Sequence, residues 1–411
     1  LQGTETALMQ TDLFVNGTDG YHTYRIPALI ATPKGTLLAF CEGRKNSRSD
    51  TGDIDLLIKR STDGGLTWSS QEIIWNDGTN TCGNPCPVID ERTGTIWLLL
   101  THNLGQDREK DIIASKAVGT RTVWVSSSTD DGQRWSKPEE ITRTTKDPSW
   151  GWYATGPGVG IQLRHGPHVG RLVIPCDHSY PGGEDFHGSH VIYSDNRGKT
   201  WKLGGLIRPK VNECQVVELA DGKGTLLMDM RSYAGTARRA HSFSRDGGIT
   251  WSAPKDHPEL IEPVCQASIL RYTWPEKGEK SRILFSNPAD ESQRRNMTVR
   301  LSYDEGKTWP VARTLNAGSS AYSSLAVLPD NTIACLYARR VEQSPGTLTF
   351  ARFTLDWLTE GKDGLVPAPN LPSPRLRRPA SKFGTISKAA RSLPEGLSGL
   401  VMNYADVIIP A

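Results

Sequence analysis

The sequence predicts an all-β fold built from repeated small sheets, and three observations support this prediction. Its 411 residues include 40 glycines and 26 prolines, which is typical of many turns and short strands rather than long helices. Short apolar runs alternate with turn residues along most of the chain. An eight-residue motif recurs along the chain and accounts for much of its unusual content of 12 tryptophans. A chain of this length forms two or three domains of roughly 100–200 residues, or one large all-β domain.

The recurring motif reads S-x-D-x-G-x-T-W and has the chemistry of a β-hairpin turn. Its Asp accepts hydrogen bonds from backbone N–H groups, and its Gly adopts a backbone conformation closed to other residues. Its Thr and Trp begin the next strand, where the indole packs against the sheet. Copies occupy residues 61–68, 128–135, 194–201, 244–251 and 302–309, with Arg134 in place of Thr in the second and Asn196 in place of Asp in the third.

The spacing of these copies predicts the architecture. Successive copies begin between 50 and 67 residues apart, which is longer than a helical solenoid repeat and close to a four-stranded propeller blade with its loops. Calcium binding by the motif is disfavoured, because one copy lacks Asp and no Glu follows at a fixed distance. We expect no long amphipathic helix before residue 355, and strands at residues 36–40, 56–58, 96–100, 123–125, 172–174, 191–193, 225–228, 299–301 and 333–337.

Composition excludes several classes of protein. The 48 Lys and Arg against 45 Asp and Glu give a net charge of only +3, which disfavours a nucleic-acid binder. With 36% hydrophobic residues and mixed charges, the chain is not expected to be disordered. No apolar run approaches the roughly 18 residues that span a bilayer. We therefore expect a globular protein without a nucleic-acid partner and without a membrane span.

The seven cysteines do not indicate a dense disulfide framework, because an odd number leaves at least one thiol free. Cys82 and Cys86 form a C-x3-C pair, but a zinc site would need two further ligands at comparable spacing. Buried thiols are the better interpretation. The chain begins at Leu1 without a leader, as processed secretory proteins do and as a trimmed chain also would. A secreted or periplasmic location is expected.

Composition also divides the chain in two. Residues 1–360 contain all copies of the motif and are expected to form the propeller. Residues 361–411 are rich in proline and basic, with Arg375, Arg377 and Arg378 clustered. This segment is interpreted as a linker or a tail of unknown role.

Two motifs together resemble those of the exo-α-sialidase (neuraminidase) family. The repeated motif is similar to the Asp-box of sialidases, which sortilin-type receptors and other glycosidases also carry. Tyr24-Arg25-Ile26-Pro27 upstream of the first copy resembles the F/Y-R-I-P motif of sialidases. The resemblance covers roughly residues 12–358. It implies a six-bladed propeller that hydrolyses terminal sialic acids with retention, without a metal or cofactor.

The resemblance also implies a set of binding residues. Three arginines that hold the substrate carboxylate correspond to Arg25, Arg231 and Arg294, and Arg44 resembles an accessory arginine. The family pattern R-x-N-L/M-T selects Arg294, although Arg295 is adjacent and leaves the choice open. Arginine suits this task because its fork matches carboxylate geometry and stays charged at any working pH.

The implied catalytic residues are Asp50, Glu213 and Tyr322, which resemble the acid/base, the activating base and the nucleophile of the family. A carboxylate nucleophile would face the substrate's own carboxylate, and sialidases use a tyrosine instead. The Tyr322 phenol has an ordinary pKa near 10, so it needs a base such as Glu213. Asp50 would protonate the leaving oxygen and then deprotonate water.

One position departs from the family pattern. After Cys335-Leu336-Tyr337 the family often has a Glu that holds the first arginine, and this chain has Ala338. We predict that Glu342, four residues further on, takes its place.

These features predict a monomeric enzyme that acts on sialylated glycans. A trans-sialidase or an enzyme that releases an anhydro-sugar would share the same catalytic set. A sialoside-binding propeller without turnover is a further alternative, which Ala338 slightly favours, but such a protein would not need a base beside a phenol.

Overall fold

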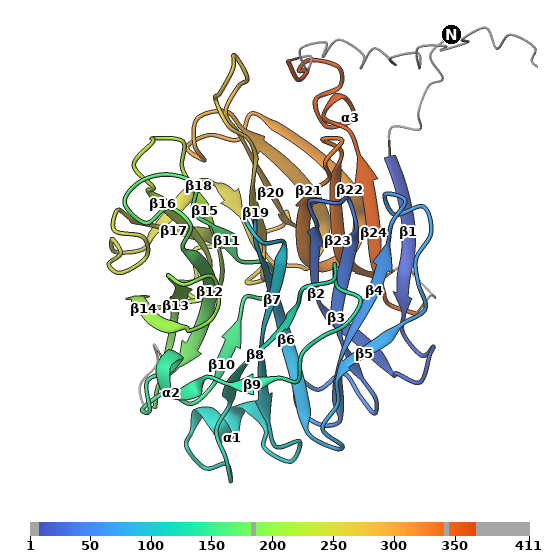
Figure 1. The fold of residues 1–411 in the computed structure, drawn as a ribbon, viewed down its shortest axis with the longest axis vertical. Coiled ribbons are helices and arrows are strands. Elements are labelled where there is room, and N and C mark those ends of the chain that lie inside the picture. The colour runs from blue at the N-terminus through green and yellow to red at the C-terminus, as the bar shows by residue number, and fades with distance from the viewer. Residues whose placement is uncertain (1–7, 182–185, 341–344, 367–411) are drawn as a thin grey trace, which may run out of the picture. The chain divides into compact units, whose positions relative to one another are not determined.

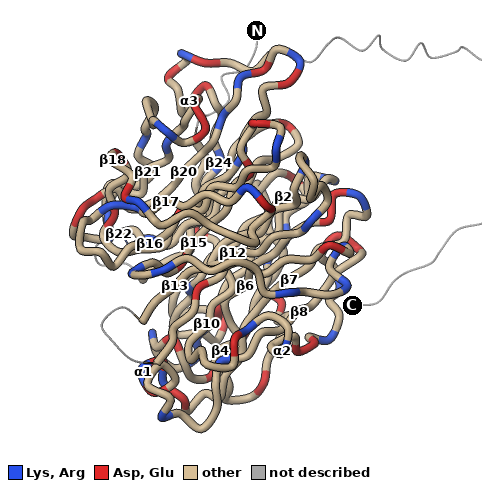
Figure 2. The backbone as a smooth tube through the Cα atoms, turned by 90° about the vertical axis from the view of Figure 1, so that its left-hand side faces the viewer, with Lys and Arg blue, Asp and Glu red and all other residues tan. Residues whose placement is uncertain are grey.

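The computed structural model describes residues 8–181, 186–340 and 345–366. Within these residues the chain is almost entirely β-structure, and its three helices have four or five residues each. The strands form curled antiparallel sheets that stand side by side (Figure 1). Positions of basic and acidic residues alternate along the whole backbone rather than gathering in one part of it (Figure 2).

Each repeating unit is an antiparallel meander. Two such units share the first sheet, in which Ile54 and Thr81 form a single parallel pairing between them. The first unit contains β2 (Thr23–Ala31), β3 (Leu37–Arg44), β4 (Ile54–Ser61) and β5 (Glu72–Trp75), and the second contains β6 (Thr81–Asp90), β7 (Thr95–Asn103), β8 (Thr122–Ser128) and β9 (Glu139–Glu140).

The next two units form separate sheets. In the third, two short strands together take the place of a single inner strand. The third unit contains β10 (Tyr153–Thr155), β11 (Ile161–Gln162), β12 (Leu172–Ser179), β13 (His187–Ser194) and β14 (Lys202–Ile207), and the fourth contains β15 (Val211–Glu218), β16 (Leu226–Ser232), β17 (Arg238–Ser244) and β18 (Lys255–Ile261).

The last sheet joins both ends of the propeller. Its order is β1 (Leu8–Val15), β24 (Thr347–Phe353), β23 (Ile333–Arg340), β22 (Val311–Val327), β21 (Arg295–Ser302), β20 (Arg282–Pro288) and β19 (Ser268–Thr273). The long strand β22 pairs with β21 through its first half and with β23 through its second half. The first strand, β1, pairs antiparallel with β24, so the beginning of the described chain closes the last unit (Figure 1).

The units form a closed ring, in which the inner strands make the contacts between units except that the third unit meets the fourth through β12. Around it, β2 lies next to β6, β6 next to β10 and β11, β12 next to β15, β15 next to β19, β19 next to β22, and β22 next to β2. Apolar side chains fill the space between neighbouring units. For example, Phe40 and Ile58 of the first unit pack in one cluster with Leu98 of the second. This radial packing is the arrangement of a β-propeller, as the sequence predicted.

The repeated motif forms the predicted turn in all five copies. In the first copy the Ser61 hydroxyl donates to Asp63 at 2.8 Å and accepts from the Gly65 N–H at 2.8 Å. The Trp68 indole donates to the Gly65 carbonyl at 3.1 Å. Equivalent bonds to Ser128, Ser194, Ser244 and Ser302 hold the other copies. The turns follow β4, β8, β13, β17 and β21, which is the third strand of each unit.

The helices are short, as expected for the region before residue 355. They are α1 (Glu109–Ile113), α2 (Thr142–Thr145) and α3 (Leu355–Thr359), and no helix of the described residues could span a membrane. All seven cysteines are buried free thiols, which confirms the interpretation of Cys82 and Cys86. The compact unit extends to Val366, where Asp363 accepts two hydrogen bonds from Arg282 at 2.7 and 2.9 Å.

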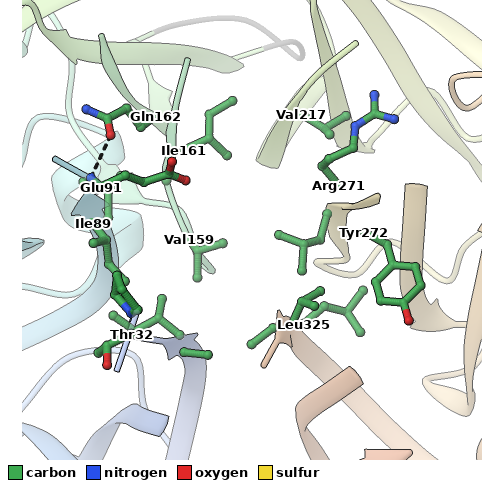
Figure 3. A pocket seen from close by; sticks show the side chains of 18 of the residues that line it. Thr32, Ile89, Glu91, Val159, Ile161, Gln162, Val217, Arg271, Tyr272 and Leu325 are labelled. Carbon is green, nitrogen blue, oxygen red and sulfur yellow. Dashed lines mark hydrogen bonds between the residues drawn. The ribbon is translucent and has the colours of Figure 1, made fainter. Parts of the chain in front are cut away.

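One pocket lies at the far end of the inner strands. It has a volume of about 580 Å³, and Ile89, Val159, Val217 and Leu325 contribute its largely apolar lining (Figure 3). Its charged side chains include Glu91 and Arg271. The pocket contains none of the seven site residues predicted from the sequence, which lie at the opposite ends of these strands or in the adjoining loops.

Candidate active site

The seven predicted site residues come from different units but from equivalent places in them. In an antiparallel meander the first strand starts, the second ends and the third starts at the same face. Arg25 and Glu213 lie near the start of the inner strands β2 and β15, and Arg44 and Arg231 lie at or near the end of the second strands β3 and β16. Asp50 lies in the β3–β4 loop, and Arg294 directly precedes the third strand β21. Tyr322 lies in the second half of β22, which is an inner strand. The structure therefore places all seven at one face.

Tyr322 and Glu213 form the centre of the site. The Tyr322 hydroxyl donates a short hydrogen bond to Glu213 Oε1, and Arg231 Nη1 lies 2.8 Å from Glu213 Oε2 and 3.5 Å from the same hydroxyl. Both Tyr322 and Glu213 are buried. Burial raises the pKa of Tyr322 well above its usual value and Glu213 raises it further, while Arg231 opposes both. The phenol is therefore neutral, with a carboxylate in place to accept its proton.

Two further arginines flank the Tyr322 ring. The guanidinium carbon of Arg25 lies 5.3 Å from the ring centroid, and that of Arg294 lies 5.8 Å from it. Arg294 Nη2 donates to the Val264 carbonyl at 3.0 Å. Together with Arg231, these side chains place three positive charges around one phenol.

Adjacent arginines have different surroundings at the start of β21. Arg295 pairs with Asp290 at 2.6 Å, and half of its side chain is exposed (51%). Arg294 instead faces Tyr322. Asn296, the next residue, has a left-handed backbone with φ of 59°. This local geometry separates the two side chains, and Arg294, the arginine that the R-x-N-M register selects, is the one beside Tyr322.

Asp50 is held by a buried charge network. Arg44 Nη2 lies 2.7 Å from Asp50 Oδ1 and 2.7 Å from Glu42 Oε2, and Arg44 Nη1 donates to the Arg48 carbonyl at 2.7 Å. Glu42 Oε1 in turn accepts from the Asn84 N–H at 2.9 Å. Partial desolvation raises the pKa of Asp50, but Arg44 and Arg25 more than offset it, so its pKa lies below the usual value.

The position of the expected family Glu contains no carboxylate. Ala338 lies in β23 opposite Leu348 and lines a pocket together with Arg25. Within the described part of the chain, the buried Nε atom of Arg25 has no hydrogen-bond partner. Glu342, which we predicted to replace the missing Glu, lies outside the described residues.

Three further titratable side chains interact electrostatically with the site residues and belong to none of the motifs quoted for the site. Burial raises the pKa of Asp177 well above its usual range, and the negative charge of Glu213 raises it further. Desolvation followed by the charge of Asp50 raises the pKa of Glu109 in α1. Arg121 is buried, with its guanidinium 3.8 Å from the centroid of the Trp152 ring. Only Asp177 had a sequence signal, because it directly follows an apolar run.

No group of three or more His, Cys, Asp or Glu side chains in the described ranges is arranged to hold a metal ion.

Comparison with known proteins shows which protein family this chain resembles. The model of the BNR repeat-like domain matches residues 35–335. The sialidase of Micromonospora viridifaciens is 35% identical over 373 residues, covering 87% of this chain and 55% of the relative. The exo-alpha-sialidase of Arthroderma benhamiae is 32% identical over 384 residues, covering 83% of this chain and 86% of the relative.

Solved structures agree with this result. Hadza microbial sialidase Hz136 matches with a TM-score of 0.75 and 32% identity, covering 85% of this chain and 69% of that one. The intramolecular trans-sialidase from Ruminococcus gnavus matches with a TM-score of 0.71 at 20% identity, covering 85% of this chain and 98% of that one. At this identity the match supports the similarity of the fold only.

The fold and site thus define a β-propeller with BNR-type repeats and an arginine-rich cleft at one face. The chain belongs to the sialidase family. It spans 55% and 62% of the length of its bacterial relatives from Micromonospora viridifaciens and Bacteroides fragilis.

Proposed function

We propose that this protein is an exo-α-sialidase that hydrolyses terminal sialic acids from glycoproteins, glycolipids and oligosaccharides. One observation carries the proposal: the buried phenol of Tyr322 donates to Glu213 between three arginines. A phenol paired with a carboxylate is an activated nucleophile, and the surrounding cations select an anionic substrate.

In this proposal, Arg25, Arg231 and Arg294 bind the substrate carboxylate. Charge-assisted hydrogen bonds from guanidinium groups are roughly twice as strong as neutral ones and fix the orientation of a planar carboxylate. The carboxylate lies on the anomeric carbon of sialic acid, so its binding also holds the reacting carbon near Tyr322. The substrate anion relieves the mutual repulsion of the three arginines.

The reaction then proceeds by two displacements, each of which inverts the anomeric carbon. First, the Tyr322 oxygen bonds to that carbon, Glu213 accepts the phenol proton, and the glycosidic bond breaks as Asp50 protonates the leaving oxygen. Next, Asp50 takes a proton from water, whose oxygen displaces Tyr322, and Glu213 returns the proton to the phenolate. Two inversions give net retention.

Asp50 must carry a proton to act in the first displacement. Its contact with Arg44 favours the carboxylate, so loosening this contact or binding an anion beside it would raise the protonated fraction. If either change raises the pKa of Asp50, a larger fraction of the enzyme carries the catalytic proton at mildly acidic pH, and we expect activity in that range.

The alternatives predict different products. A trans-sialidase would transfer the sugar to an acceptor, and an anhydro-sugar-releasing enzyme would use a hydroxyl of the same sugar. A non-catalytic binding propeller would release nothing, and the hydrogen bond between Tyr322 and Glu213 argues against it.

The deciding experiment is incubation with a fluorogenic sialoside, followed by identification of the released sugar and of its first-formed anomer by NMR. Free sialic acid released first as the α-anomer supports the proposal. An anhydro-sugar or transfer to added lactose would overturn the hydrolase assignment, and absence of release would overturn catalysis. Export from the cell stays a prediction, which fractionation of the source cells would test.

A further inference from the structure

A second carboxyl group lines the same pocket as Asp50. This pocket has a volume of about 550 Å³. Asp50 and its loop neighbours Ser49 and Thr51 contribute to its lining, and Glu109 of α1 contributes from a separate element. Apart from Gly105, every residue of the lining has a hydroxyl, amide or charged side chain. Two carboxyls that are distant in the sequence therefore border one polar space.

The contact between Asp50 and Arg44 is unfavourable for a general acid. Asp50 must be protonated when the glycosidic bond breaks, but the buried guanidinium of Arg44 lies 2.7 Å from its carboxylate. Desolvation raises the pKa of Asp50, but Arg44 and Arg25 outweigh it, so the pKa lies below its usual value. A neighbouring group that holds a proton would offset this effect.

Glu109 has the opposite surroundings. Within residues 8–181, 186–340 and 345–366 its carboxyl forms no ion pair or hydrogen bond. The loops 182–185 and 341–344 contain no Lys or Arg that could pair with it. Desolvation raises the pKa of Glu109, the charge of Asp50 raises it further, and the charge of Arg121 opposes both. Of the two carboxyls in this pocket, Glu109 therefore keeps its proton to the higher pH.

The other charged groups around Glu109 do not reverse this order. On its own helix and the preceding cap, Arg108 and Lys110 are exposed, and Asp111 is half-buried. The groups that act on Glu109 from other elements are Asp50, Arg121, Asp177, Glu213, Arg231 and Tyr233.

The two arginines in this set have other partners. Arg231 pairs with Glu213 at 2.8 Å, and Arg121 donates to the side chains of Asn84 and Thr101. The largest electrostatic effect on Glu109 is the like charge of Asp50.

We propose that Glu109 and Asp50 share one proton, and that Glu109 supplies Asp50 with the proton that the leaving group takes. This inference rests on the proposed function, and Glu109 acts in it through Asp50 without touching the substrate. Two carboxyls in one site retain a single proton to higher pH than an isolated one, because both cannot readily ionise together. The pocket has room for water, at roughly 30 Å³ a molecule, to carry the proton between them.

The proton balance is closed over the two displacements. In the first, the proton leaves the Glu109 carboxyl for the Asp50 carboxylate, and Asp50 passes it to the leaving oxygen, so both carboxyls end ionised. In the second, Asp50 takes a proton from the attacking water and returns it to Glu109.

The kinetic test is the pH profile of kcat/KM for a fluorogenic sialoside. Glu109→Gln should move the falling limb to lower pH by about one unit, because Asp50 then titrates without a like charge beside it. The loss should be about tenfold at neutral pH and smaller on the acidic side of the limb. Glu109→Asp keeps a carboxyl and should keep most of the limb. The control, Asp111→Asn, removes the same charge from the same helix and should leave the limb in place.

Three results would overturn the proposal. The limb could stay in place in Glu109→Gln. The variant could lose kcat/KM equally at every pH, which would indicate a substrate contact or a structural role. The limb could move as far in Asp111→Asn, which would indicate a general charge effect.

Carbon-13 NMR of the free wild-type enzyme tests the shared proton without catalysis and without any variant that must fold. The side-chain carboxyl signals of Glu109 and Asp50, assigned through the backbone, should each titrate in two steps at common pH values. A single step for Glu109 near the ordinary pKa of a glutamate overturns the proposal. If the two signals titrate together but no sialoside is hydrolysed, the proposed function fails and the shared proton stands.

Discussion

The guanidinium of Arg44 lies 2.7 Å from the carboxylate of Asp50, although only 2% of the Arg44 side chain and 53% of the Asp50 side chain are exposed. Arg44 also forms an ion pair with Glu42, and the carboxylate of Glu42 accepts a hydrogen bond from the backbone N–H of Asn84. A buried, oriented cation therefore faces a loop carboxylate that is open to solvent. This arrangement controls both the position and the protonation of the proposed acid/base.

We predict that Arg44→Gln moves the falling limb of the pH profile of kcat/KM to higher pH. The general acid works when protonated, and activity falls as pH rises through its pKa. Arg44 lowers the pKa of Asp50, so its removal raises that pKa and extends activity toward neutral pH. Arg44→Lys keeps the charge and serves as the control. If the pH at which kcat/KM falls is the same in Arg44→Gln as in wild type, a group other than Asp50 controls this decrease.

Tyr322→Phe should reduce hydrolysis of a fluorogenic sialoside by at least about a thousandfold while binding of sialic acid is largely retained, because the hydroxyl is the proposed nucleophile and the ring only fills space. Steady-state kinetics and titration calorimetry measure the two effects. Tyr337→Phe removes a buried hydroxyl that bonds Gln10 at 2.6 Å and controls for loss of a hydroxyl from a core tyrosine. Near-normal turnover in Tyr322→Phe would exclude this residue as the nucleophile.

Arg294→Ala should weaken sialic acid binding far more than Arg295→Ala, its matched neighbour. Loss of a charge-assisted contact to the substrate costs about 1.5–3 kcal/mol, whereas an exposed ion pair contributes about 0–1 kcal/mol. Inhibition constants for a sialic acid analogue measure both. Equal losses, or the reverse order, would contradict the assignment of Arg294 as the third carboxylate-binding arginine.

Asp363→Asn should lower the free energy of unfolding by about 1.5–3 kcal/mol at neutral pH, because buried Arg282 loses a charged partner. Burial raises the pKa of Asp363, but hydrogen bonds from Arg282, Lys280 and Tyr303 lower it by a larger amount, so the net pKa of Asp363 is below its usual value. The stabilisation is therefore present above the unfolded pKa of about 3.9 and is lost as pH falls below it.

Urea unfolding of wild type and Asp363→Asn at several pH values checks the sign. The difference in the free energy of unfolding between wild type and Asp363→Asn should become smaller as the pH is lowered. Asp356→Asn, an exposed substitution in α3, is the control and should change stability by less than about 0.5 kcal/mol. A difference that persists unchanged at low pH would disagree with the assigned role of the carboxylate.

Glu342→Gln should raise the KM for sialosides much more than it lowers kcat, if Glu342 supports Arg25 in place of the residue missing at Ala338. Gln343→Ala is the neighbouring control. Ala338→Glu should rescue the variant, because position 338 lines the same pocket as Arg25. Wild-type kinetics in Glu342→Gln would show that Glu342 does not replace the family glutamate that is missing at Ala338.

Much of the fold could be predicted because its signals are local. The motif at residues 61–68 closes its own turn through Ser61, Asp63 and Gly65, and each of the other four copies does the same. The seven candidate site residues were selected through their local motifs, including Arg294, and their roles stay predictions. The mutual geometry of these residues, and the roles of Glu109 and Arg121 as neighbours of Asp50, have no comparable local signal.

The sequence by itself determined the all-β class and the repeated turns, and it supplied the buried-thiol interpretation of Cys82 and Cys86 and the list of candidate site residues. Only the tertiary structure decided that Tyr322 donates to Glu213, that Arg44 faces Asp50, and that arginines from β2, the β3–β4 loop and β23 meet in one basic pocket. Turns and strands depend on residues a few positions apart. The site depends on closure of the ring, which brings together side chains from residue 25 to residue 340 at equivalent ends of separate antiparallel units.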